Sequence, residues 1–375
     1  MRGTVPAALA ISLMSMPAPL AAQRAGQLIS AEPIVDTPSG MQAWRITYWT
    51  TTAKSAPIRA TGIVAAPREA IPAQPRPVLA FTHGVWGITK KCAPSLSPNF
   101  WSWTAGLQGA PRGYTVVAPD YPGLGSDGVH PLLIGPDTAR SVLDSVRAAR
   151  EIPGAAAGKR FAVWGESQGG HAAIWTGQRA RHYAPELELV GVAASAPATY
   201  LVDNLRQGSD PSARTFLTAL ALYSWSRFYN APLSSVAGPQ SRGIINRMSE
   251  NNCVSFDSLP KLGTVLGILT LRRNLRNVDL GSIEPWAGFA RSNSVKPAQL
   301  NVPLLVSQNA NDKIVAPAVT RQFARDACAA RKRVRWINLN GKGHETSAKD
   351  TASAALDWIG DRFAGRPAPS DCGKF

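Results

Sequence analysis

Two hydrophobic patterns follow each other along the N-terminal half of the chain. Residues 44–49 alternate aromatic or β-branched side chains with polar ones, which is typical of a half-buried strand, and residues 60–66 form a second strand that Pro67 closes. We expect these two strands to form an antiparallel hairpin. Residues 23–43 are rich in Pro, Ala and Ser, and we expect them to form a loosely ordered arm.

From residue 77 onwards, short continuously apolar segments alternate with amphipathic ones. Apolar residues three and four positions apart predict helices, and the continuous segments predict buried strands. Strands of this kind separated by helices are typical of a parallel sheet covered on both faces. The predicted strands are 78–82, 114–118, 160–164, 187–194, 302–307 and 333–338, and the predicted helices are 138–151, 168–182, 317–330 and 347–363. The fold class is therefore α/β, with a mostly parallel central sheet and helices on both faces.

The alternation of strands and helices stops near Pro197 and resumes at residue 299. The intervening residues 198–298 contain helical patterns but no clear strand. We therefore expect one α/β core made of residues 23–197 and 299–375, with a helical cap inserted at 198–298.

The first residues resemble a secretory signal. Arg2 is followed by an apolar stretch that is too short to span a membrane, and small residues precede Ala22. We expect residues 1–22 to be a signal peptide and the protein to be secreted, either to the periplasm or to the extracellular space.

The chain is strongly basic, with a formal net charge of +16. Its basic residues are scattered, apart from a cluster at 331–335, and no nucleic-acid-binding motif is present. We therefore expect no nucleic-acid partner. The charges either lie on solvated faces or favour a transient contact with an anionic surface such as a lipid interface. We expect the protein to be a monomer.

A candidate nucleophile lies at Ser167, in the sequence Gly165-Glu166-Ser167-Gln168-Gly169. The pattern directly follows the predicted strand 160–164 and opens the next predicted helix. A serine on such a sharp turn projects its hydroxyl, and glycines on both sides let the turn close. The sequence therefore predicts a serine-dependent hydrolase.

A serine nucleophile needs a base and an acid that orients the base, and in this fold they follow in the order serine, acid, histidine. His344 lies in a glycine-rich loop after the last predicted strand, and Asp312 follows the strand 302–307. We expect these two residues to complete the triad, with Asp203 as the alternative acid. The other histidines are His83, His130, His171 and His182.

Backbone N–H groups must also stabilise the oxyanion that forms during acyl transfer. We expect one donor to be Gln168, directly after the nucleophile. The second donor should come from the loop 83–87, with Val85 preferred and Gly84 as the alternative.

The sequence contains no Walker loop, dinucleotide fingerprint or metal-ligand pattern, so we expect neither a cofactor nor a metal. Its four cysteines are an even number, which in an exported protein suggests disulfides. Their spacing alone does not choose among the three pairings.

Several segments together resemble the secretory lipase family of the lipase A type, within the α/β-hydrolase superfamily. They are Cys92–Ser95, Gly113–Asp120, Val142–Ala148, Gly169–Trp175, Tyr183–Leu187 and Val190–Gly191. The resemblance implies an α/β-hydrolase fold with a helical cap between the sixth and seventh sheet strands, and the triad Ser167, Asp312 and His344. It also implies the disulfides Cys92–Cys253 and Cys328–Cys372.

Two segments depart from the family pattern. The family's fungal members usually have Gly-Tyr-Ser-Gly-Gly at the elbow, where this chain has Glu166 and Gln168 beside the serine. They also carry an acidic residue in the oxyanion loop, where this chain has His83 and Gly84. The cap, which sets substrate preference, shows little traceable similarity.

The leading hypothesis is a secreted carboxylic-ester hydrolase, a lipase or esterase, acting on a small-molecule or lipid ester through an acyl-enzyme on Ser167. One alternative is a serine aminopeptidase-like hydrolase, which would need an acidic cap residue such as Glu250 or Glu284 to hold the substrate amine. Another is a non-catalytic binding protein on the same scaffold.

Overall fold

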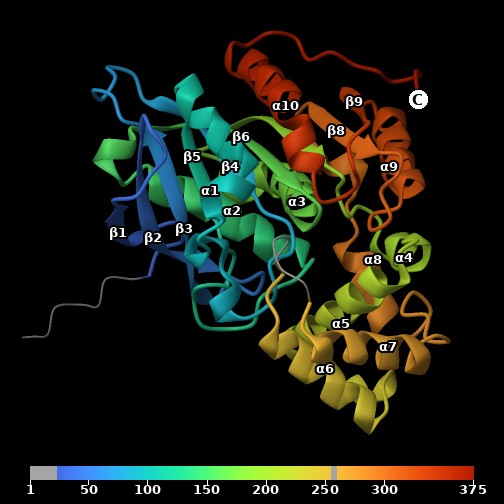
Figure 1. Ribbon diagram of the computed structural model, residues 1–375. Helices are drawn as coiled ribbons and strands as arrows, with labels where there is room; N and C mark the ends of the chain where they lie inside the picture. The colour runs from blue at the N-terminus through green and yellow to red at the C-terminus, as the bar shows by residue number, and fades with distance from the viewer. Residues whose placement is uncertain (1–22, 255–259) are drawn as a thin grey trace, which may run out of the picture.

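The computed structural model describes residues 23–254 and 260–375, so the predicted signal peptide at 1–22 lies outside the described residues. The described residues form one nine-stranded sheet in the order β1-β2-β3-β5-β4-β6-β7-β8-β9 (Figure 1). Its strands are β1 (Leu28–Ile34), β2 (Met41–Thr51), β3 (Pro57–Pro67), β4 (Arg76–Thr82), β5 (Thr115–Pro119), β6 (Ala157–Glu166), β7 (Glu188–Ser195), β8 (Leu304–Asn309) and β9 (Val334–Leu339).

The strands β4 to β9 are parallel, whereas β1, β2 and β3 are joined by antiparallel pairings. The central strands β5 and β8 are buried along their whole length, which explains their continuously apolar sequences. The predicted α/β fold with a mostly parallel sheet is confirmed.

Helices cover both faces of the sheet and create two hydrophobic layers. One layer contains Val142 of α2, Ile174 of α3 and Phe323 of α9. The other contains Leu107 of η3 and Leu356 of α10. The core helices are α1 (Phe100–Trp103), α2 (Gly135–Ala149), α3 (Gln168–Tyr183), α9 (Pro317–Ala329) and α10 (Ser347–Phe363). The 3₁₀ helices are η1 (Lys90–Cys92), η2 (Pro94–Leu96), η3 (Ala105–Arg112), η4 (Pro153–Ala155), η5 (Leu233–Ser235) and η6 (Pro297–Gln299).

The expectation of a loosely ordered arm at 23–43 is wrong, because β1 and the start of β2 occupy it. In β1, Leu28 pairs with Tyr48 and Ile34 pairs with Ala43 of β2. The strand lies at the sheet edge and none of its residues is buried, so it tolerates Pro33. The added strand also means that the helical insertion follows the seventh strand of the sheet rather than the sixth.

The insertion between β7 and β8 is helical, and its apolar side chains join Leu132 and Val315 of the α/β core in a third hydrophobic cluster; those from the insertion include Leu220, Trp225, Ile245, Leu271 and Trp286. Its α-helices are α4 (Leu201–Gln207), α5 (Pro211–Phe228), α6 (Pro239–Asn251), α7 (Leu262–Asn274) and α8 (Trp286–Asn293). Figure 1 shows α5, α6 and α7 grouped at one corner of the molecule, below the sheet in this view. Among the described residues, no helix has the length and apolar character that crossing a membrane requires.

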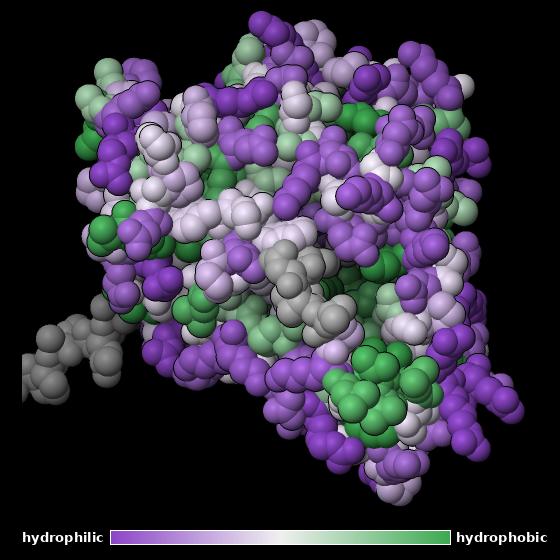
Figure 2. Space-filling model, viewed as in Figure 1, coloured by the Kyte–Doolittle hydropathy of each residue, from purple (hydrophilic) through white to green (hydrophobic). Residues whose placement is uncertain are grey.

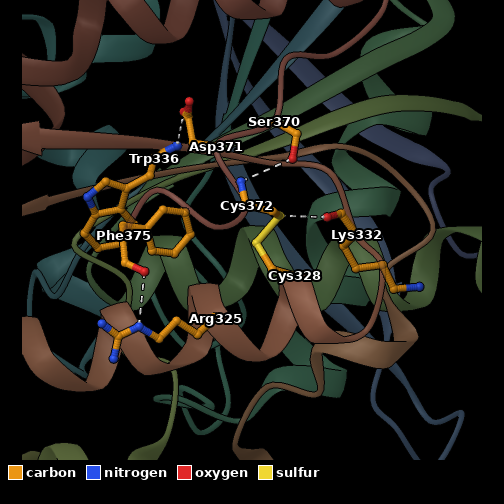
Figure 3. Close-up of a disulfide and its surroundings, with 8 residues drawn as sticks. All are labelled: Arg325, Cys328, Lys332, Trp336, Ser370, Asp371, Cys372 and Phe375. Carbon is orange, nitrogen blue, oxygen red and sulfur yellow. Dashed lines mark hydrogen bonds between the residues drawn. A yellow bond between two sulfur atoms is a disulfide. The ribbon is translucent and has the colours of Figure 1, made fainter.

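The C-terminal tail is fixed to the core by the disulfide Cys328–Cys372 (Figure 3). The ring of Phe375 stacks on Trp336 with centroids 5.1 Å apart. The Asp371 carboxylate accepts a hydrogen bond from the Trp336 backbone N–H at 3.1 Å. The tail is therefore held by covalent, aromatic and polar contacts.

Candidate active site

The candidate nucleophile Ser167 stands on the turn between β6 and α3. Its backbone has φ 54° and ψ −119°, a conformation that non-glycine residues rarely adopt. The Ser167 N–H donates to the Ser195 carbonyl at 2.9 Å, which ties the turn to the end of β7. Neighbouring contacts therefore hold the strained turn that projects the hydroxyl.

The two glycines of the elbow are required by close packing against the end of β4. A Cβ on Gly165 would lie 1.9 Å from the Thr82 hydroxyl oxygen, and one on Gly169 would lie 1.9 Å from the Thr82 carbonyl oxygen. The Thr82 hydroxyl donates to the Gly169 carbonyl at 2.8 Å. Larger residues at either position would push the elbow away from β4.

The imidazole of His344 lies between Ser167 and Asp312. Its Nε2 is 2.8 Å from Ser167 Oγ, and its Nδ1 is 2.7 Å from Asp312 Oδ2. In this geometry Nδ1–H donates to the carboxylate and Nε2 accepts from the serine hydroxyl. The structure thus brings together the three residues that the sequence predicted.

The Asp312 carboxylate is fully buried and is held in place by several donors. Its Oδ1 accepts from the backbone N–H groups of Ile314 and Val315, both at 2.9 Å, and its Oδ2 accepts from Gln308 Nε2 at 3.0 Å. The alternative acid, Asp203, lies on α4 in the helical insertion. The contact with His344 therefore favours Asp312 over Asp203 as the candidate orienting acid.

Glu166, directly before Ser167, is a second acidic group at the site, and no sequence pattern indicated a role for it. Burial raises the pKa of Glu166 to about 7, although the charge of His344, the Ala348 N–H and Lys349 all favour its ionised form. Burial lowers the pKa of His344, but its hydrogen bond to Asp312 and the charges of Asp312, Glu166 and Glu345 outweigh burial and raise this pKa overall. The base of the triad is therefore tuned by more than one carboxylate.

Two other histidines have positions unrelated to proton transfer from Ser167. His171 is buried behind the elbow with its Nε2 2.7 Å from the Asn293 carbonyl, and burial lowers its pKa to about 4. His182 is exposed near the end of α3.

The remaining pair, His83 and His130, supports the expected oxyanion loop. His130 Nε2 lies 3.0 Å from the Gln168 side-chain nitrogen, and burial lowers the pKa of His130 to about 3. The His83 ring nitrogens lie 2.6 Å from the Gly84 carbonyl and 3.2 Å from the Asp120 carbonyl. Both rings are structural supports around the residues expected to bind the oxyanion.

The predicted oxyanion donors lie beside the nucleophile. Gln168 is the first residue of α3, so its backbone N–H has no acceptor within the helix. A Cβ on Gly84 would be 3.6 Å from Ser167 Cβ, and Val85 lines a cavity together with Ser167 and Gln168. The loop 83–87 thus borders the space where an acyl oxygen would lie.

A disulfide and a backbone hydrogen bond connect this loop to the cap. The bond Cys92–Cys253 joins the segment after the loop to the segment after α6, across 161 residues of sequence. The Val254 N–H donates to the Trp86 carbonyl at 3.0 Å. The position of the oxyanion loop is therefore coupled to that of the cap.

An apolar cavity of about 80 Å³ adjoins Ser167. Among the apolar residues of the cap helix α5, Leu217 and Trp225 line it, whereas Leu220, Leu222 and Phe228 do not. Residues from outside that helix complete the lining, including Leu132, Leu201 and Val315.

Across residues 23–254 and 260–375, no three His, Cys, Asp or Glu side chains gather so that they could hold a metal ion.

Known lipases resemble this chain in sequence and in fold. Lipase 5 of Candida albicans is 27% identical over 273 residues, which cover 70% of this chain but 57% of Lipase 5, so the chain spans little more than half of that relative. Lipase 1 of the same species is 31% identical over 368 residues, covering 84% of this chain and 71% of Lipase 1. The X-ray structure of Candida antarctica lipase A matches 93% of this chain and 84% of its own, with a TM-score of 0.72 and 19% identity, which shows a shared fold.

The family comparison covers most of the chain. A profile described as "Secretory lipase" matches residues 107–371, which include the elbow, the whole helical insertion and both partners of Ser167. With this match and the α/β-hydrolase fold, the chain belongs to the secretory lipase family.

Proposed function

We propose that this protein hydrolyses carboxylic esters through an acyl-enzyme on Ser167. The observation that carries the proposal is the continuous hydrogen-bonded chain from Ser167 Oγ through His344 to Asp312. Such a chain activates a hydroxyl that is otherwise a weak nucleophile at neutral pH. Membership of the secretory lipase family favours esters over amides.

In the acylation step, Ser167 Oγ forms a bond to the ester carbonyl carbon while His344 Nε2 takes the hydroxyl proton. The carbonyl oxygen becomes an oxyanion, which the N–H groups of Gln168 and of Val85 or Gly84 stabilise. The tetrahedral intermediate then collapses, the bond to the alcohol oxygen breaks, and His344 returns the proton to the leaving alcohol. Asp312 stabilises the imidazolium during this step.

Deacylation repeats the same chemistry with water as the nucleophile. Neutral His344 takes a proton from water, whose oxygen adds to the acyl carbon. The second tetrahedral intermediate releases Ser167 Oγ, which recovers its proton from His344, and the free acid leaves. The products are one acid and one alcohol.

The decisive experiment is a chromogenic ester panel of increasing acyl length, run on the full chain and on Ser167→Ala. Wild type should turn over part of the panel, and Ser167→Ala should retain only a small residual rate. Equal rates for both proteins would refute the proposal. Cleavage of aminoacyl amides without ester cleavage would instead support the aminopeptidase alternative.

We also propose that the enzyme contacts anionic lipid interfaces through one face of α7. Leu262, Val265, Leu266 and Leu269 follow helical spacing and are all exposed, with Leu262 at 74%. Figure 2 shows the resulting apolar patch at the corner where α7 lies. Exposed patches of this kind mark interaction sites.

The charge next to this apolar stripe favours an anionic surface. Lys261 precedes the helix, Arg272 and Arg273 end it, and Arg276 follows, while residues 260–278 contain no acidic side chain. An amphipathic helix binds an anionic membrane by burying its apolar residues in the interface, while its basic residues attract the anionic lipids.

Vesicle flotation tests this contact. The full chain should bind phosphatidylglycerol vesicles and should bind phosphatidylcholine vesicles much less. Leu262→Ser/Leu266→Ser should weaken the first interaction at least about tenfold, given the apolar area removed. Ile71→Ser, which changes an exposed side chain between β3 and β4, is the matched control and should bind as wild type. Unaltered binding by the double variant would contradict the assignment.

We further propose that the protein is exported and acts in the periplasm or outside the cell. The family is secretory, and two disulfides are the kind of crosslink that persists in oxidising compartments. Fractionation of producing cells, followed by immunodetection of each fraction, tests the location. Retention in the cytoplasm with reduced cysteines would contradict it.

A further inference from the structure

A second and much larger cavity of about 740 Å³ lies in the cap between α4, α5, α7 and residues 275–280; it is open to solvent, and the arginines that line it are exposed. Within the described residues, Asp279 is the one acidic residue that lines this cavity, and its other charged residues are basic. The lining arginines are Arg206, Arg214, Arg272, Arg273 and Arg276.

The single carboxylate is already paired. Arg206 holds Asp279 through both Nε and Nη2, with the shortest contact at 2.7 Å. Arg214 donates to the backbone carbonyls of Arg206 and Gly208. Within residues 23–254 and 260–375, Arg214, Arg272, Arg273 and Arg276 form no ion pair. The cavity therefore presents four guanidinium groups without a protein counter-charge in this part of the chain.

The arginine-lined cavity adjoins the catalytic one. Leu205, Arg214 and Thr218 line both cavities. The space next to Ser167 is about 80 Å³, well below the roughly 300–1,000 Å³ of ordinary ligand pockets, whereas the neighbouring 740 Å³ falls within that range. A substrate with its ester at Ser167 therefore has room to extend towards the arginines.

Helix stabilisation explains only part of this arrangement. Arg272 and Arg273 lie in the last turn of α7, where cations interact favourably with the helix dipole. Arg214 is different, because it lies in the first turn of α5, where the dipole disfavours a positive charge. This unfavourably placed cation is also the one shared by both cavities.

We propose that this cavity binds an anionic group, a phosphate or carboxylate, carried by the ester substrate. The inference rests on the proposed ester hydrolysis and names the substrate class that the site prefers. Guanidinium groups bind phosphate and carboxylate with paired, charge-assisted hydrogen bonds, and several of them together can hold a doubly charged phosphate. The ester carbonyl lies at Ser167 while the anionic group lies among Arg214, Arg272, Arg273 and Arg276.

Matched ester pairs test the preference. The first pair, para-nitrophenyl valerate and mono-para-nitrophenyl glutarate, differs by a carboxylate on the acyl side. The second pair, monobutyrylglycerol and its phosphate monoester, differs by a phosphate on the alcohol side. Wild type should have the higher kcat/KM for the anionic member of at least one pair, and the responding pair identifies which side of the ester carries the anion.

Variants then connect that preference to the cavity. Arg272→Gln/Arg273→Gln/Arg276→Gln should lower the anionic-to-neutral ratio of kcat/KM at least about tenfold, the usual effect of losing hydrogen bonds to a charged group. Arg214→Gln should lower the same ratio. Because it is a single change, it still tests the inference if the triple variant does not fold. Arg366→Gln, an exposed arginine of the tail that pairs with Asp361, should keep the wild-type ratio. A wild-type preference for neutral esters in both pairs, or ratios unchanged in the cavity variants, would overturn the inference.

Direct binding separates this inference from the proposed catalysis. Inorganic phosphate should bind the full chain carrying Ser167→Ala, measured by calorimetry, and adding Arg272→Gln/Arg273→Gln/Arg276→Gln should abolish that binding. If no ester is hydrolysed but phosphate binds in this way, ester hydrolysis fails while the anion site stands. If esters are hydrolysed but phosphate binding is absent or independent of the arginines, the anion site fails and the proposed function stands.

Discussion

The carboxyl group of Glu166 and the imidazole of His344 interact electrostatically, and each favours the charged form of the other. Glu166 occupies the variable position directly before the nucleophile, so the elbow itself carries a group that acts on the base. Because burial raises the pKa of Glu166 to about 7, this group changes its charge near neutral pH. Both catalysis and stability should therefore depend on its ionisation.

The first prediction concerns the pH dependence of activity in Glu166→Gln. Catalysis requires neutral His344, so the acidic limb of kcat/KM follows the pKa of this residue. The substitution removes one of the negative charges that raise this pKa, and the acidic limb should move to lower pH. Asp312 and Glu345 remain and keep part of the effect. An acidic limb at the same pH in both proteins, measured with a neutral ester, would contradict the assigned interaction.

The second prediction concerns the stability of the same variant. The pKa of Glu166 is higher in the folded protein, about 7, than its ordinary value of 4.5, so the folded state holds a proton that the unfolded state has released. Its contribution to stability is present below pH 4.5 and is lost as pH rises through 7. Relative to wild type, Glu166→Gln should gain about 2–3 kcal/mol between pH 4.5 and pH 8, less than full burial would give, because the side chain is partly accessible. Urea unfolding at both pH values measures the difference, and a constant difference would contradict the prediction.

The third prediction separates the two candidate acids. Asp312→Asn removes the charge that orients His344 and stabilises its protonated form, so kcat should fall by roughly 10³- to 10⁴-fold. Asp203→Asn changes an acid on α4 and should leave the hydrogen bond between Asp312 and His344 intact. Ester turnover by both variants is the measurement, and a greater loss in Asp203→Asn would reverse the assignment.

The central sheet and the positions of the triad were predictable because each depends on a local pattern. Strands buried on both faces have continuously apolar sequences, and the glycines around Ser167 are required because a Cβ at either would lie 1.9 Å from an atom of Thr82. Asp312 and His344 follow strand ends, where parallel strands bring side chains to one edge. Chain order and loop composition were therefore sufficient to select them.

Other features depended on tertiary contacts that no local pattern records. The edge strand β1 needs only one neighbour, so its sequence does not alternate clearly. The cap helix α6 is largely polar because only a few of its residues, such as Ile245 and Met248, pack against the rest of the cap. The role of Glu166 also lay outside prediction from sequence, since its pKa depends on burial against residues of a distant loop and helix.

The fourth prediction compares the two disulfides. Removing either bond by replacing both cysteines with alanine should cost roughly 2–5 kcal/mol of stability, since each closes a long loop, of 161 or 44 residues in sequence separation. Only Cys92→Ala/Cys253→Ala should also reduce kcat/KM, because that bond joins the oxyanion loop segment to the cap. Cys328→Ala/Cys372→Ala loosens a tail remote from Ser167 and should keep its kcat/KM at temperatures where it is folded. Equal catalytic losses in both double variants would contradict the proposed coupling.

The fifth prediction compares two glycines. In Gly169→Ala the new methyl group would lie 1.9 Å from the Thr82 carbonyl oxygen, which is backbone and cannot turn aside, so the elbow must shift. We expect a loss of about 1–3 kcal/mol in stability, typical of overpacking, and at least a hundredfold loss in kcat, because a displacement of about 1 Å at a reacting group has that effect.

In Gly263→Ala, near the start of α7, the methyl group meets no atom within 4 Å. Since alanine favours helix over glycine, this variant should be up to about 1 kcal/mol more stable and should retain wild-type kcat on soluble esters. Thermal unfolding and initial rates measure both effects, and a fully active Gly169→Ala would show that the elbow does not need the observed contact with β4.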